Sequence, residues 1–256
     1  MTALLILGIA AVEKQLQASA QQQQQTHVSL TNNYRITNLP DDWVVQDINP
    51  SKLESRQLAL SNIHNFEQIA IICREEEAIR TYSVECLQST GSADSSTAAN
   101  PSYITIDRFN NLQQRPEVIN ATITRGHNKS ITPTDVLALF LDLQKEVTLT
   151  VLSEGDVAYS IESQQPTTVN VTKTSTSLEA LPTTTTVPAS LVGYSSSVTN
   201  LGFLSLNSKT FALCFVDPTQ NTGYVIYSPG WPIQTQQLPP DILQIMQSFE
   251  LVASSS

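Results

Sequence analysis

The chain is poor in the residues that build catalytic and metal centres. Its 256 residues include only 8 glycines, 3 cysteines and 3 histidines. It contains no phosphate-binding glycine loop, no Gly-x-Ser-x-Gly and no His-Glu-x-x-His. The histidines lie far apart, with no two at zinc-ligand spacing: His27, His64 and His127. The sequence therefore assigns no catalytic residue, no metal ligand and no cofactor.

Charge is scarce as well. Charged residues make up 14% of the chain, and the excess of acidic over basic residues gives a formal net charge of -10. Phosphate contacts need clustered Lys and Arg, so this balance argues against nucleic acid and anionic membranes as partners. Two acidic groups lack the alternating ligands of a calcium loop and are interpreted as solvated turn carboxylates: Asp41, Asp42 and Asp47, and Glu154 and Asp156.

No apolar run approaches the length of a membrane span. The run from Ala3 to Val12 has the length of the hydrophobic region of a signal peptide, and Ala18-Ser19-Ala20 supplies a small-x-small cleavage pattern. No Lys or Arg precedes that run, and a buried N-terminal helix is the alternative. We predict a signal peptide at 1–20 cleaved near Ala20, and an extracytoplasmic protein, secreted or on the cell surface, with no transmembrane span.

The remainder predicts one domain. A Gln-rich segment at 21–31 is expected to be a disordered linker, 32–252 a single domain, and 253–256 a flexible tail. Three Asn-x-Ser/Thr triplets are possible glycosylation sites or ordinary polar positions: Asn120, Asn128 and Asn170. Cys73 and Cys86 are a possible disulfide, but a tight hairpin would separate them, so buried thiols are favoured. Cys214 lies in an apolar strand and is expected in the core.

Two helices are expected among many strands. Thr132 as N-cap, Pro133 and Asp135 begin a helix over 133–146, and Pro240 begins another. The strand 211–216 is apolar at every position, which predicts burial on both faces, and 220–223 predicts a hairpin turn. Weaker extended patterns are expected at 120–124 and 147–153. This order favours an α+β domain with a central antiparallel sheet flanked by helices.

Three segments carry a family resemblance. They are the opening YRITNLPDDWVV from Tyr34, the strand PASLVGY from Pro188 and the ending MQSFE from Met246. Together with the helix from Pro133, this order resembles PsbP-like domains, the family named for an extrinsic protein of photosystem II. The resemblance implies an α/β/α sandwich and a non-enzymatic accessory role. It does not imply a photosystem, and none of the family's functional residues is matched here.

These observations favour a secreted, non-enzymatic accessory or binding module whose partner is an extracytoplasmic protein or a glycan. Five aromatic residues are candidates for a ligand groove, although core packing is the more economical use of most of them: Trp43, Tyr194, Tyr224, Tyr227 and Trp231. The alternatives are a secreted hydrolase with a dispersed acidic active site and a glycosylated structural component of the cell surface.

Overall fold

Ten strands form one sheet in the part of the chain that the structure describes. The computed structural model describes residues 25–48, 66–74, 103–125, 130–152, 155–174, 183–200 and 204–254. The strand order is β1-β2-β10-β6-β7-β8-β9-β5-β4-β3. The strands are β1 (Gln25–Ser29), β2 (Tyr34–Leu39), β3 (Trp43–Asp47), β4 (Phe66–Arg74), β5 (Tyr103–Phe109), β6 (Asp156–Thr174), β7 (Thr183–Asn200), β8 (Leu204–Asp217), β9 (Thr222–Trp231) and β10 (Phe249–Ser254).

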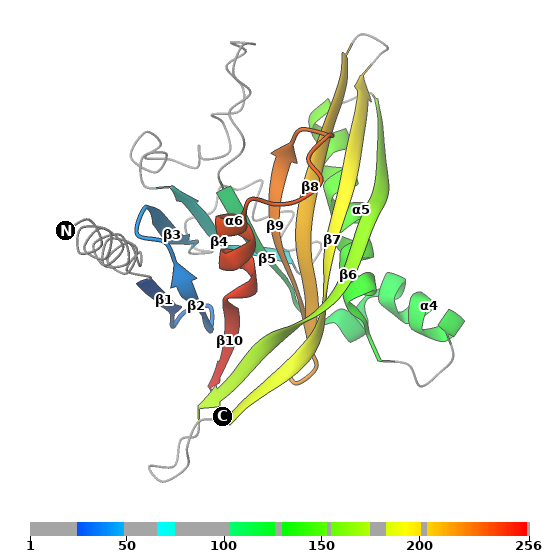
Figure 1. The fold of residues 1–256 in the computed structure, drawn as a ribbon. Coiled ribbons are helices and arrows are strands. Elements are labelled where there is room, and N and C mark those ends of the chain that lie inside the picture. Colours follow the sequence, from blue (N-terminus) through cyan, green and yellow to red (C-terminus); the bar gives the residue numbers. More distant parts are fainter. Residues whose placement is uncertain are drawn as a thin grey trace, which may run out of the picture.

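The sheet curls until it is nearly closed into a barrel, so the predicted α+β sandwich is wrong (Figure 1). The chain is mostly β, and its sheet is not purely antiparallel because β10 runs parallel to β6. The error came from β6 and β7, which the sequence divides at Pro166 and Pro188 into shorter strands. They are single strands of 19 and 18 residues, paired along nearly their whole length. The natural twist of such long strands curls a sheet.

Side chains join the two ends of the strand order. The Tyr34 hydroxyl in β2 donates a 2.6 Å hydrogen bond to the Asp47 carboxylate in β3. The other oxygen of that carboxylate lies 3.3 Å from the imidazole Nε2 of His27 in β1. Burial, and to a smaller extent the contact with Asp47, raises the pKa of Tyr34 well above its usual value. Polar side chains thus bridge this seam, and no β2–β3 ladder is present among the described strands.

The sheet has an apolar core on each face. Along β8, Phe211, Leu213 and Phe215 belong to the core of the concave face, while Ala212 and Cys214 belong to that of the convex face. The prediction that this strand is buried on both faces is confirmed. The predicted hairpin is confirmed too, because β8 pairs antiparallel with β9 across a turn.

Both predicted helices are present, and they cover opposite faces of the sheet. Helix α5 (Pro133–Leu152) packs on the convex face, and α6 (Pro240–Gln247) lies within the concave face (Figure 1). Asp135 accepts hydrogen bonds from the backbone N–H and the hydroxyl of Thr132, which fixes the start of α5. Where Gly223 of β9 passes under α5, an added Cβ would lie 2.8 Å from Val136.

Four local predictions need correction. Helix α5 continues to Leu152, so 147–153 is not extended, and 120–124 lies in helix α4 (Pro116–Arg125), which follows the short 3-10 helix η4 (Leu112–Gln114). In α5, Val147 packs against the apolar core of the convex face, and this tertiary contact outweighed its β propensity. The segment predicted as a linker contains β1, and β10 extends into the predicted tail to Ser254. Backbone pairing with β2 and β6 orders these two segments.

Candidate functional site

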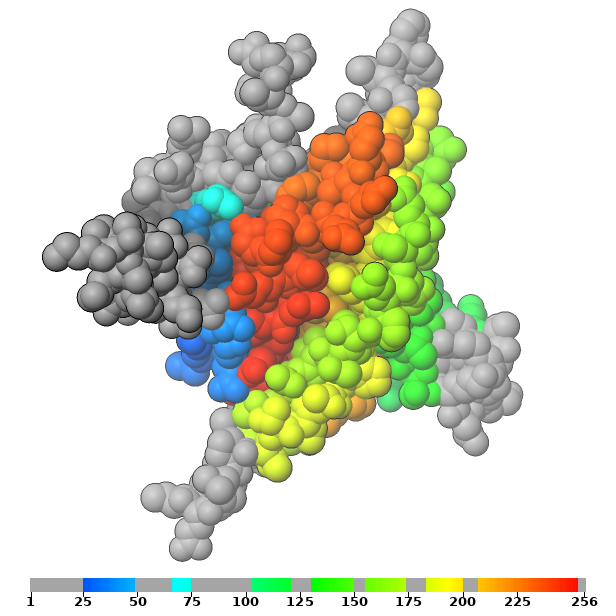
Figure 2. Space-filling view, in the orientation of Figure 1, coloured from blue at the N-terminus to red at the C-terminus, as the bar shows by residue number. Residues whose placement is uncertain are grey.

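A pocket of about 260 Å³ opens on the concave face. On one side lie β6 and β7, and on the other lie α6 and the loop 232–239 that leads into it. Figure 2 shows this part of the surface, with the loop and α6 in orange and red and the long strands in green and yellow. The pocket exists because α6 has only 8 residues and therefore covers only part of the concave face.

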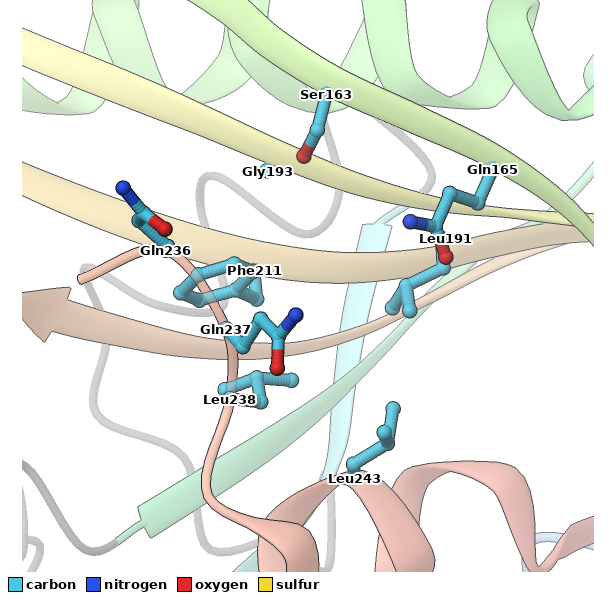
Figure 3. A pocket seen from close by; sticks show the side chains of 9 residues that line it. All are labelled: Ser163, Gln165, Leu191, Gly193, Phe211, Gln236, Gln237, Leu238 and Leu243. Atoms are coloured by element: carbon cyan, nitrogen blue, oxygen red, sulfur yellow. The ribbon is translucent and has the colours of Figure 1, made fainter.

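The lining combines neutral polar groups with an apolar floor (Figure 3). The polar groups are one hydroxyl and three amides, from Ser163, Gln165, Gln236 and Gln237, and the apolar side chains are Leu191, Phe211, Leu238 and Leu243. Each amide can donate and accept hydrogen bonds, so the wall matches an uncharged ligand that does both. A few polar groups around an apolar surface are typical of ligand sites.

A β-bulge shapes this wall. The pairing of β6 with β7 shifts between Ile161 and Ser163, which places an extra residue in β6. Glu162 and Ser163 therefore both face the concave side: Glu162 contacts the buried Lys209 there, and Ser163 lines the pocket. Opposite the bulge, a Cβ at Gly193 would lie 2.6 Å from the Ser163 hydroxyl oxygen, so glycine leaves room for this side chain.

One ion pair borders the pocket. The Lys209 ammonium lies 2.6 Å from the Glu162 carboxylate and 5.3 Å from the centre of the Phe211 ring. Lys209 is almost fully buried, and its charge is compensated by Glu162. Hydrogen bonds from Lys209 and from Ser195 lower the pKa of Glu162. Among the described residues, the site therefore presents no uncompensated charge next to Phe211.

A second cavity, of about 330 Å³, lies where the β2–β3 turn meets the start of α6. Its lining includes Trp43 and Arg74, whose guanidinium lies 5.5 Å from the centre of the indole ring. The same guanidinium bridges Asp42 and Asp241 at 3.0 and 2.9 Å. Its charge is thus already satisfied within the chain, and this arrangement joins the turn to α6.

The convex face buries a carboxyl. Asp107 of β5 is fully buried, and neither of its oxygens has a hydrogen-bond partner of good geometry among the described residues. Burial raises the pKa of this carboxyl well above its usual range, and the Tyr227 hydroxyl opposes that effect to a smaller extent. Asp107 is absent from the pocket lining, and its side chain is on the opposite face of β5 from Ile106 of the concave core.

The structure separates most of the residues considered from the sequence. All five candidate groove aromatics are buried or half-buried, and only Trp43 contributes to one of the cavities described above. The two acidic groups are not joined: Asp42 contacts Arg74, Asp47 contacts Tyr34, and Glu154 lies outside the described residues. Within the described ranges no three His, Cys, Asp or Glu side chains are grouped as a metal site.

The possible modification sites are only partly described. Asn120 lies exposed on α4, and Asn170 lies exposed on β6, where its amide donates to Glu250 at 3.3 Å. Asn128 lies outside the described residues. Cys73 is buried in β4 and Cys214 in β8, but Cys86 is not among the described residues, so the possible Cys73–Cys86 disulfide stays a prediction.

The pocket residues carry no signal that the sequence alone reveals. They come from positions 163 to 243, on three strands, a loop and a helix. Glutamine and serine form no motif at these spacings, and only the bulge and the curl of the sheet bring them together. The closest signal is the uncharged stretch around Gln234–Gln237 before two prolines.

No helix among the described residues is both long enough and apolar enough to span a bilayer. No family model, curated protein or solved structure matches the chain. The resemblance to PsbP-like domains therefore stays a prediction from the residues, and the sandwich that it implied is not the fold.

Proposed function

We propose that the chain is a secreted binding module that holds an uncharged side chain of a partner protein in the pocket on the concave face. The observation that carries this proposal is the lining of the pocket, where three glutamine amides and the Ser163 hydroxyl surround an apolar floor. An uncharged side chain that enters can bury apolar surface and satisfy its polar atoms in the same place.

The same lining favours binding over hydrolysis. None of the described residues that line the pocket has an ionisable side chain. Glu162, which precedes the lining residue Ser163, pairs with Lys209, and its pKa is lowered, which is the reverse of what a general acid needs at neutral pH. A hydrolase with a dispersed acidic site has no corresponding support at this pocket.

Secretion is part of the proposal and rests on the N-terminal sequence. The apolar run from Ala3 and the Ala18-Ser19-Ala20 pattern support a cleaved signal peptide. N-terminal sequencing of the protein recovered from the extracytoplasmic fraction tests it. We expect a new N-terminus close to Gln21, and an intact Met1 in the cytoplasmic fraction would contradict secretion.

Small probes test the pocket directly. N-acetyl amino-acid amides carrying Tyr, Leu or Gln side chains are titrated at about millimolar concentration, where ligands of this size bind. We expect the Gln236 and Gln237 side-chain amide NMR signals to shift with these uncharged probes but not with N-acetyl-aspartate amide. Gln237→Trp fills the pocket from the loop and should abolish the shifts of the remaining lining residues.

The matched control is Gln234→Trp. Gln234 is exposed on the same loop and does not line the pocket, so this variant should bind like the unmodified protein. Methyl glucoside is included because a glycan was the other expected partner. Shifts with the sugar alone, or equal shifts in both Trp variants, would reject the proposed function.

A further inference from the structure

The strand that forms one wall of the pocket has an open edge. From Asp156 to Val169, β6 pairs with β7 only, because its ladder with β10 begins at Asn170. Most side chains along this stretch are exposed, including Ile161 at 50%. Figure 1 shows β6 at the outer margin of the β6–β8 ribbon, with α5 behind it. A strand edge of this kind presents backbone N–H and C=O groups that no neighbouring strand of the described chain uses.

Pro166 indicates which backbone groups face outward. Proline has no N–H and is tolerated in a strand where that position points away from the neighbouring strand. Backbone direction alternates along an antiparallel pair, so the N–H groups of Gln164 and Thr168 also face the open edge. Pro166 and the bulge at Glu162 make the edge irregular, which limits unselective strand pairing.

The open edge and the pocket share residues. Ser163 and Gln165 belong to the exposed stretch of β6, and both line the pocket. A further strand would lie about 4.8 Å beyond β6, with alternate side chains directed to the concave face. Those side chains would stand next to Ser163 and Gln165, at the entrance to the amide-lined cavity.

We propose that an extended, uncharged segment of a partner polypeptide pairs with the edge of β6 between Ser160 and Thr168 and inserts one side chain into the pocket. This binding mode rests on the proposed function of the pocket and specifies its partner. Backbone hydrogen bonds give such a complex its affinity, and the side-chain pocket gives it specificity.

Charge favours a different protein over a second copy of this chain. The only charged side chain between Ser160 and Thr168 is Glu162, which Lys209 compensates, so the edge suits an uncharged segment. Two copies of the chain each carry a formal net charge of -10 and repel one another. Pairing of β6 with β6 of a second copy is therefore the competing outcome in the test.

The test begins with a displayed library of random eight-residue peptides, selected against the full chain and counter-selected against Gln237→Trp. An enriched peptide is then synthesised in two forms, one unmodified and one N-methylated at alternate residues, which cannot donate to a strand edge. Both forms are titrated against the unmodified protein, Gln164→Pro, Gln237→Trp and Gln234→Trp. Circular dichroism confirms that each variant is folded, and the N-methylated peptide tests the edge without any change in the protein.

We expect N-methylation and Gln164→Pro each to weaken binding about fivefold to tenfold for every backbone hydrogen bond removed. Gln237→Trp should abolish binding, and Gln234→Trp should leave it unchanged. A peptide that tolerates both edge modifications but not Gln237→Trp would overturn strand pairing and leave the proposed function standing. No enrichment would overturn both. A dimer in gel filtration that Gln164→Pro converts to a monomer would assign the edge to a second copy and reject the proposal.

Discussion

The two faces of the sheet share strands but are covered very differently. The convex face lies under the 20-residue α5, whereas the concave face is covered by the 8-residue α6 and the loop before it. The same strand, β8, supplies apolar side chains to both faces. The length of the covering helix, more than the composition of the strands, therefore decides which face contains the pocket.

The faces also treat charge differently. On the convex side Asp107 is fully buried without a hydrogen-bond partner of good geometry in the described chain, and its raised pKa favours the neutral acid. On the concave side the buried Lys209 is paired with Glu162 at the border of the pocket. The convex face, which α5 closes, thus holds a buried carboxyl in its core, and the concave face, which the pocket leaves open, compensates its charges next to the site.

Removing a large side chain from the convex face, under α5, should lower the stability of the fold more than any other change considered. Phe140 of α5 is fully buried, with its ring centre 4.7 Å from that of Tyr227. Phe140→Ala should lower the free energy of unfolding by about 3–5 kcal/mol, because it leaves a cavity between α5 and the sheet. Urea titration measures the change.

Leu243→Ala is the comparison on the open face. Leu243 is partly buried and borders the existing pocket, so its truncation should lower the free energy of unfolding by less than about 2 kcal/mol. If the two substitutions lower the free energy of unfolding equally, the contrast between the covered convex face and the partly open concave face is wrong.

Asp107, buried on the convex face, should make the free energy of unfolding of the protein depend on pH. Its pKa is higher in the folded chain than the value of about 3.9 in the unfolded chain, so the folded state holds the proton more tightly. The stabilising contribution is complete below about pH 4 and is lost as the pH rises toward the folded pKa, by about 1.4 kcal/mol per pH unit.

Asp107→Asn removes this titration. Relative to the unmodified protein, the variant should gain stability as the pH rises from about 4 toward the folded pKa of Asp107, measured by urea titration at each pH. If the free energy of unfolding of the two proteins changes with pH in parallel, the pKa of Asp107 is the same in the folded and the unfolded chain, which would contradict the prediction.

Two matched glycine substitutions compare how tightly each face is packed. Gly223→Ala places a Cβ 2.8 Å from Val136, a β-branched residue on α5, and should cost about 1–3 kcal/mol through overpacking. Gly193→Ala places its Cβ 2.6 Å from the Ser163 hydroxyl, which can rotate into the pocket, so it should cost less. Thermal unfolding of both variants tests the order, and the reverse order would contradict it.

The features that the sequence predicted well are those with a local physical cause. Thr132, Pro133 and Asp135 specify the start of α5 by capping, and the burial of β8 on both faces follows from its uninterrupted apolar residues. The helix beginning at Pro240 was also recoverable from its apolar spacing.

The features that were missed depend on distant contacts. The pairing of β6 with β7 carries both strands through Pro166 and Pro188, where local signals predicted breaks. The curl of the sheet, the bulge at Glu162 and the short reach of α6 then create a pocket from residues that have no common motif. Local propensity contains none of this information, because each contact joins segments far apart in the chain.

The smallest effect is expected at the ion pairs that hold the open face together. Arg74 is 45% exposed and bridges Asp42, which is 50% exposed, to Asp241 of α6. Such exposed pairs contribute only about 0.2–1 kcal/mol, and salt screens them. Asp42→Asn should therefore lower the free energy of unfolding slightly in low salt and hardly at all in 1 M NaCl.

The Lys209–Glu162 pair is the comparison, because its lysine is buried. This pair should keep its contribution in high salt, so Lys209→Gln should lower the free energy of unfolding in both conditions. Equal salt sensitivity of the two variants would mean that the border of the pocket is as open to solvent as the Arg74 bridge.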